Sequence, residues 1–92
     1  MQVIVKKPGD KLRIQNVKNT YFDFFKVIGG PFTVLPINNV NVYMPADMQG
    51  EKNFKINNVD VCGTVIITGA TSDGLETDIR LKHFDTVRCL VY

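Results

Sequence analysis

The side chains most often used as catalytic bases, nucleophiles and zinc ligands are rare in this chain, which has one histidine and two cysteines. Cys62 and Cys89 each sit inside an apolar run, and burial raises the pKa of a thiol, so neither fits an activated nucleophile. His83 lies between Lys82 and Phe84 in an expected helix, where packing or solvation is its ordinary role. No Cys-x-x-Cys or paired-histidine spacing occurs. We therefore expect no enzyme activity, no catalytic residues, no metal site and no cofactor.

Three carboxylates, those of Asp73, Glu76 and Asp78, gather in and after the glycine-containing segment 69–74. Their spacing is not that of a calcium-binding loop. No lysine follows the last glycine of this segment, so it is not a Walker-type phosphate loop either. A loop of this composition remains a candidate for holding a small ligand, and a ligand-sequestering role is one alternative function.

Four basic side chains surround the first turn of the chain and form a candidate nucleic-acid contact: Lys6, Lys7, Lys11 and Arg13. Basic groups bind phosphates, and an aromatic strand residue such as Tyr43 can stack on a base. The net charge is only +2, divided as +4 over residues 1–46 and −2 over residues 47–92. This asymmetry is typical of a solvated face, so nucleic-acid binding is kept as an alternative function.

The polar segment 46–53 is the candidate surface for a partner protein. It belongs to an irregular stretch from Pro45 to Asp60 that is long for so small a domain, and long connections often carry function. Phe54 is either an anchor that pins this stretch to the core or an exposed contact. The predicted partner-binding residues are Tyr43, Asp47, Met48, Gln49, Glu51 and Lys52.

Length and composition predict one folded domain covering residues 1–92, because 45% of the residues are hydrophobic and 22% are charged. No apolar run approaches the 18 residues of a membrane span, and the first residues are too short for a signal-peptide core. The two separated cysteines favour reduced, buried thiols and a cytoplasmic protein, although a disulfide between them stays open.

The first half of the chain predicts a hairpin, a helix and a second hairpin. Val3–Val5 and the alternating residues 11–15 flank a Pro-Gly turn. Asn19 or Thr20 can cap a helix that ends at Gly29–Gly30. The strands 32–37 and 40–44 then flank a turn at Asn38–Asn39, with Pro36 at an edge or bulge. Helical spacing predicts one buried face of this helix, with Phe22 at its margin; the face is formed by Tyr21, Phe24, Phe25 and Ile28. The apolar face of strand 40–44 is expected to pack on this helix, and it is formed by Val40, Val42 and Met44.

The second half predicts one buried central strand and a second helix. The run 61–68 is almost continuously apolar, which indicates a strand covered on both faces, with a bulge or close approach at Gly63. Thr77 can cap a helix that reaches about His83, and residues 85–92 fit either helix or strand. The predicted fold is α+β: a mixed, mostly antiparallel sheet of four to five strands, with the aromatic helix on one face and a second helix near the C-terminus.

Several of these segments together resemble a family of small uncharacterised proteins encoded by phages, plasmids and other mobile elements of bacteria. The resemblance rests on Val3–Val5 with Pro8–Gly9, the helix ending in Gly29–Gly30, strand 32–37, the loop leading to Asn57, and the segment 62–69. The segment 47–53 departs from the acidic, glycine-containing pattern of that family. The resemblance implies a cytoplasmic accessory protein and supplies no catalytic residues.

The expected function is therefore non-enzymatic binding, in which the protein sterically inhibits or modulates a host or defence-system protein. One domain of this size can present a standard protein interface of about 800 Å². Homo-oligomerisation through an edge strand is a further form of association that the sequence allows. No membrane contact is expected.

Overall fold

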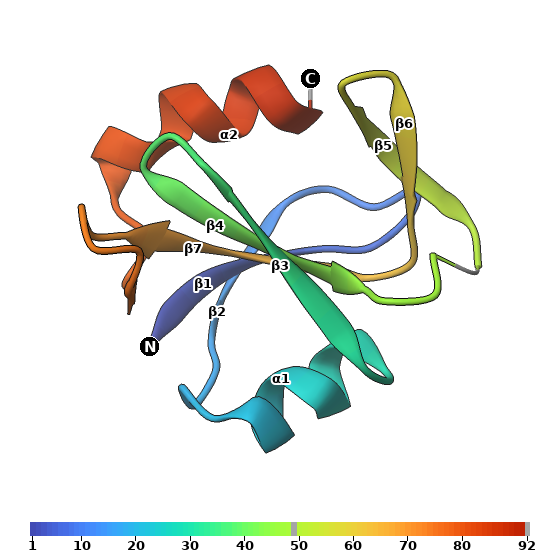
Figure 1. Ribbon diagram of the computed structural model, residues 1–92, viewed down its shortest axis with the longest axis horizontal. Helices are drawn as coiled ribbons and strands as arrows, with labels where there is room; N and C mark the ends of the chain where they lie inside the picture. Colours follow the sequence, from blue (N-terminus) through green and yellow to red (C-terminus); the bar gives the residue numbers. More distant parts are fainter. Residues whose placement is uncertain (49, 92) are drawn as a thin grey trace.

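The computed structural model describes residues 1–48 and 50–91 and shows an α+β fold in three layers (Figure 1). An antiparallel sheet forms the middle layer. Helix α1 (Tyr21–Ile28) lies on one face, and helix α2 (Phe84–Val91) lies on the other together with the two-stranded sheet β5–β6. The predicted α+β class, with one helix on a face of the sheet and a second near the C-terminus, is confirmed.

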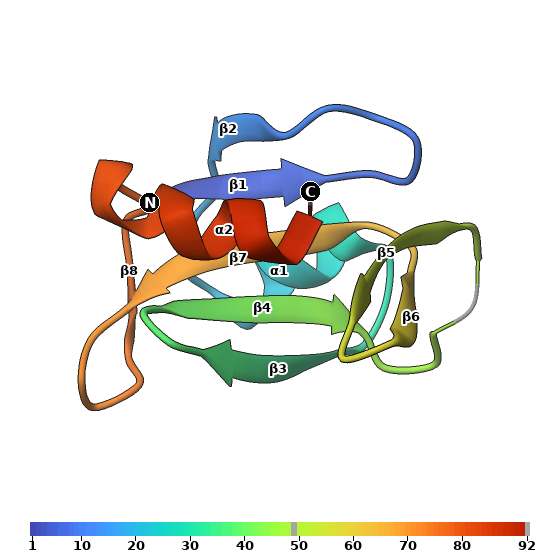
Figure 2. The same ribbon diagram turned by 90° about the horizontal axis from the view of Figure 1, so that it is seen from above.

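The main sheet has six strands: five lie in the spatial order β2-β1-β7-β4-β3, and the sixth, β8, pairs with the end of β7 (Figure 2). Every pairing is antiparallel, so the sheet is not mixed and has one strand more than expected. β7 lies at the centre, as its apolar sequence predicted. The strands are β1 (Gln2–Lys6), β2 (Arg13–Asn16), β3 (Phe32–Ile37), β4 (Val40–Pro45), β7 (Val65–Ala70) and β8 (Glu76–Thr77).

Each face of the sheet buries its own core, because successive strand residues point to opposite faces. In β1, Val3 and Val5 face α1, whereas Ile4 faces α2. The core on the α1 side contains Val3, Val5, Val17, Phe24, Ile28, Tyr43 and Ile66. The core on the α2 side contains Ile4, Val40, Val42, Met44, Ile56, Val61, Val65, Ile67, Ile79 and Val87.

Helix α1 begins and ends as its sequence predicts, yet its buried face is narrower. The Thr20 hydroxyl accepts a hydrogen bond from the Asp23 N–H over 3.1 Å, and Gly29 adopts a φ of 95° beyond the last turn. Phe24 and Ile28 are buried, which stabilises the helix by about 1.5–3 kcal/mol for each side chain.

The prediction that Tyr21 and Phe25 complete this buried face is wrong, since both side chains are exposed. Phe24 and Ile28 are four residues apart, so they form one line along the helix, and Phe25 is rotated by about 100° from Phe24. An eight-residue helix touching a sheet along that line leaves its flanking aromatic side chains at the surface. Phe22 is exposed, in agreement with its predicted position at the margin.

Strand β4 follows the predicted turn, but the face that was predicted to pack on α1 lies on the opposite side of the sheet. Asn38 has a φ of 51°, and β3 pairs with β4 across the turn from Ile37 to Val40. Val40, Val42 and Met44 face the α2 side, not α1 as expected. Tyr43 instead packs under α1. The alternation in the sequence identified the two faces, but the helix covering each face depends on the topology.

The stretch from Pro45 to Asp60, predicted to be irregular, contains a β-hairpin. β5 (Lys52–Ile56) pairs with β6 (Val59–Cys62) around Asn57 and Asn58, whose φ angles are 51° and 66°. The apolar run predicted as one strand is therefore two strands in different sheets, divided at Gly63, which has a φ of 83°. Phe54 packs against the α2-side core, which confirms its role as an anchor.

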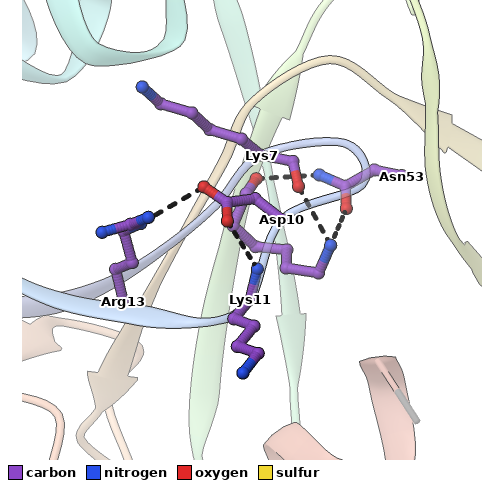
Figure 3. Close-up of polar contacts among 6 residues, drawn as sticks. Lys7, Asp10, Lys11, Arg13 and Asn53 are labelled. Atoms are coloured by element: carbon purple, nitrogen blue, oxygen red, sulfur yellow. Dashed lines mark hydrogen bonds and ion pairs between the residues drawn. The ribbon is translucent and has the colours of Figure 1, made fainter.

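Asn53 fastens this hairpin to the end of β1 (Figure 3). Its Nδ2 donates to the carbonyl oxygens of Lys6 and Gly63, both over 2.8 Å. Its Oδ1 accepts from Lys6 Nζ over 2.9 Å.

The C-terminal helix starts later than predicted. Thr77 lies in β8 and caps no helix; a 3₁₀ turn, Leu81–His83, leads into α2 at Phe84. Residues 84–91 are helical because Phe84, Val87, Leu90 and Val91 then reach the sheet together. Cys89 is exposed on α2 and Cys62 is half-buried, so the predicted burial of both is wrong; both thiols are free. None of the helices within residues 1–48 and 50–91 has the length and apolar character needed to cross a membrane.

Candidate functional site

A groove with a volume of about 410 Å³ lies on the α1 side of the sheet, over the part of β3 and β4 that α1 leaves uncovered. Helix α1 and the residues before it form one wall, and the segment leading into β8 forms the other. The groove exists because α1 is short and buries only one line of side chains. Its principal lining residues are Tyr21, Phe24, Phe32, Val34, Asn41, Tyr43 and Glu76.

Aromatic rings form a continuous wall of this groove. Tyr21 stacks on Phe32 with ring centroids 4.7 Å apart, and Tyr43 meets Phe24 edge-on at 4.9 Å. Phe32 and Tyr43 are 5.8 Å apart and join the two pairs. Such contacts hold the rings in fixed orientations. Tyr21 is 61% exposed, so part of the wall is open to a ligand.

Asn41 is the polar residue at the base of the groove, and it is only 2% exposed. Its Nδ2 donates to the Gly74 carbonyl oxygen over 3.1 Å. Its Oδ1 is buried and has no hydrogen-bond partner in the part of the chain that the structure describes. Buried polar groups are nearly always paired, so this oxygen is an acceptor without its donor.

Glu76 is the charged residue that lines the groove. The Tyr43 hydroxyl donates to Glu76 Oε2 over 3.3 Å. Burial, followed by the nearby Glu76 charge, raises the pKa of Tyr43, so its hydroxyl stays protonated and remains a donor to the carboxylate. Among the described lining residues there is one carboxylate and no lysine, arginine or histidine.

The polar side chains that line the groove include two acceptors, the buried Asn41 Oδ1 and the Glu76 carboxylate, and the Asn19 amide, which can both donate and accept. Asn41 Oδ1 and the Glu76 carboxylate both require donors, and the rings offer π faces that attract cations. An anion would meet a carboxylate without a compensating positive charge. The arrangement can bind a donor-bearing or cationic group.

The predicted partner-binding residues do not form one site. Tyr43 is 6% exposed and lines the groove, so its expected place on an open surface beside segment 46–53 is wrong. Met48 packs against the α2-side core, and Lys52 pairs with Asp60 at 3.3 Å. Asp47 and Glu51 are exposed, whereas Gln49 lies outside the described residues.

The predicted nucleic-acid contacts do not converge either. Lys6 is bonded to Asn53, and Arg13 forms an ion pair with Asp10 at 3.2 Å. The hydrogen bond from Arg13, together with the Lys11 N–H, lowers the pKa of Asp10, which therefore keeps its negative charge among these bases. Figure 3 shows the side chains of Lys7 and Lys11 pointing in different directions.

His83 and Asp78, which belongs to the predicted acidic cluster, form contacts within the fold. His83 is 1% exposed and its Nδ1 accepts from the Arg80 N–H over 2.8 Å. Burial is the main reason that its pKa is lowered. Asp78 accepts from the Gln2 N–H over 2.9 Å and joins β8 to the first strand. Across residues 1–48 and 50–91, no three side chains that bind metals come together.

Comparison with known proteins adds no assignment to this site. No family model matches the chain, and neither a curated protein nor a solved structure is significantly similar to it. The function is therefore argued from the groove. Sequence reasoning missed Asn41, although an asparagine between valines in a buried strand is an available signal. Glu76 had no such signal, because only the pairing of β8 with β7 brings it to Tyr43.

Proposed function

We propose that the protein is a non-enzymatic binding protein, and that it occupies a surface of a host or defence-system protein in the cytoplasm. The observation that carries this proposal is the aromatic groove with the unpaired acceptor of Asn41 at its base. The resemblance to small proteins of phages and other mobile elements supports the choice of partner. Steric inhibition or modulation of that partner needs no chemistry beyond binding.

Exposed apolar side chains on α1 and β3 support a protein partner. α1 and the edge strand β3 carry five of the nine large hydrophobic residues that are exposed in the described part of the chain. Apolar side chains gathered in this way mark interaction surfaces, whereas scattered ones need no explanation. The five are Tyr21, Phe22, Phe25, Val34 and Leu35. Tyr21 and Val34 line the groove, whereas Leu35 lies on the α2 side of the sheet, opposite Val42.

The edge strand also offers backbone groups to a partner. β3 has β4 on one side and no strand on the other in the described sheet, so its outer hydrogen-bonding groups are open. Pro36 lies in this edge strand, as its sequence position predicted, and its missing N–H limits how far a foreign strand can pair. Self-association through β3 is the second form that this contact can take.

The test is capture of a partner by immobilised protein, with variants that separate the candidate surfaces. Val34→Lys places a charge beside the groove, and we expect it to reduce the capture of a stoichiometric host protein by at least about tenfold. Ile14→Lys is the matched control, because Ile14 is 56% exposed on edge strand β2 and Val34 is 46% exposed on edge strand β3.

Glu51→Lys tests segment 46–53 in the same assay. Retention of the partner by both control variants supports the groove as the contact. If Glu51→Lys abolishes capture and Val34→Lys does not, the contact surface is the loop and the proposal for the groove is wrong. Sedimentation of the free protein at several concentrations separates self-association from binding to a host protein.

A further inference from the structure

The orientation of the Asn41 amide determines which atom is unpaired. Nδ2 lies 3.1 Å from the Gly74 carbonyl oxygen, and exchanging the two amide atoms would place oxygen against oxygen. The amide is therefore held with Oδ1 as the free atom. Asn41 is 2% exposed and lines the groove, and its unpaired oxygen is buried beneath the surface of the groove.

A second acceptor lies on the same groove. The Tyr43 hydroxyl donates a hydrogen bond to Glu76 Oε2, and Oε1 of this carboxylate accepts no hydrogen bond from the described residues. A ligand group that donates to both Asn41 Oδ1 and Glu76 must carry more than one N–H. A positive charge on this group would strengthen its attraction to the carboxylate. No basic side chain among the residues that the structure describes lines the groove to supply it.

The aromatic wall adds a requirement for shape. Tyr21 and Phe32 are stacked with an interplanar angle of 26°, and Tyr21 is the more open of the two. A planar cation can lie flat against such a ring while its edge donates hydrogen bonds. Guanidinium is planar, permanently charged and has five N–H donors, whereas an ammonium is compact and strongly hydrated.

We propose that the groove binds the guanidinium group of an arginine side chain, which Asn41 Oδ1 and the Glu76 carboxylate accept and the Tyr21 ring covers. This inference rests on the proposed function, since the arginine belongs to the partner protein. It names the chemical group that the partner must present. Phe24, Phe32 and Tyr43 act as positioning residues, because they hold the Tyr21 ring and the Glu76 carboxylate in place.

The test uses the purified protein and a small probe, so it does not require the partner. N-acetyl-arginine-N-methylamide is titrated into ¹⁵N-labelled protein, and the side-chain amide of Asn41 is followed by NMR together with the backbone amides of Tyr21 and Glu76. We expect saturable shifts at these positions. The corresponding citrulline compound has the same shape without the charge, and it is expected to bind at least about tenfold more weakly, as is the lysine compound.

Two variants locate the contacts. Glu76→Gln keeps the shape of the side chain and removes its charge, and Asn41→Leu removes the unpaired acceptor; each is expected to weaken binding of the arginine probe by about tenfold or more. Glu51→Gln is the matched control for loss of one carboxylate and should leave the affinity unchanged. Equal affinity for the arginine and citrulline probes, or shifts that avoid the groove, would overturn the inference.

The two proposals fail in different ways. If the arginine probe leaves the groove unchanged while Val34→Lys still abolishes capture of a partner, the groove binds a protein but not through arginine. If the arginine probe saturates the groove while capture is insensitive to Val34→Lys, the guanidinium site stands and the proposed partner surface is wrong.

Discussion

Two asparagines with opposite hydrogen-bonding environments provide the sharpest test of the groove. Asn41 has one hydrogen bond and a buried oxygen without a partner, whereas Asn53 has three hydrogen bonds that join two segments. The perturbation is the same at both positions, a replacement by leucine, which has a similar shape and no polar atoms. The free energy of unfolding should change in opposite directions.

For Asn41→Leu, two contributions oppose each other. The variant removes a buried unpaired acceptor, a group that costs about 1–3 kcal/mol. It also loses the hydrogen bond to the Gly74 carbonyl, worth about 0.5–1.5 kcal/mol. Gly74 is exposed, so water can replace that bond. The free energy of unfolding should therefore rise by about 1 kcal/mol, while binding of the arginine probe falls.

For Asn53→Leu, the contributions all have the same sign. Three hydrogen bonds are lost, each worth about 0.5–1.5 kcal/mol, and the Lys6 and Gly63 carbonyl oxygens lose their donor. The free energy of unfolding should fall by about 2–4 kcal/mol. The two variants are thus expected to differ by about 3–5 kcal/mol, well beyond the error of the measurement.

The assay is unfolding in urea followed by circular dichroism, with the slope of the free energy against denaturant compared between variants. Guanidinium chloride is unsuitable because its cation is the group that the groove is proposed to bind. A loss of more than about 1 kcal/mol in Asn41→Leu would refute the reasoning, because Asn41 would then stabilise the free protein and not serve a ligand.

Three further predictions concern the α2 side of the molecule and its surface. Gly69→Ala should lower the free energy of unfolding by about 3 kcal/mol, because the new Cβ would lie 2.5 Å from Thr77 Oγ1. Gly30→Ala is the control and should leave the free energy of unfolding unchanged, because there is open space around its Cβ. The pKa of His83 is lowered from 6.5 by burial, so the unfolded chain binds the proton more readily. The free energy of unfolding should therefore keep its full value above about pH 6.5 and fall below that pH by at most about 1.4 kcal/mol per pH unit. This dependence should be absent from the His83→Gln variant. A rise in the free energy of unfolding on acidification that is lost in His83→Gln would contradict the burial argument. Exposed Cys89 should react with a thiol reagent in the folded protein without prior unfolding, and protection of this thiol until global unfolding would contradict the placement of α2.

The sequence by itself determined the features that depend on a few neighbouring residues. Thr20 caps α1, Gly29 ends it and Asn38 turns the chain, because capping and positive φ are settled within three or four residues. The second part of the long apolar run correctly indicated the central strand β7, since a strand that is apolar on both sides must be covered on both, whereas its first part belongs to β6 in the other sheet. Together these local signals were sufficient for the α+β class.

The tertiary structure decided where the groove lies and what it contains. The sequence pattern cannot show that α1 buries Phe24 while leaving Tyr21 exposed, because burial depends on the width of the contact with the sheet. It also cannot show that the face of β4 carrying Tyr43 and Asn41 is the one on the α1 side of the sheet. Glu76 reaches that face only through the pairing of β8 with β7. Contacts between residues more than 30 positions apart depend on strand order and register, which the spacing of residues along the chain does not specify.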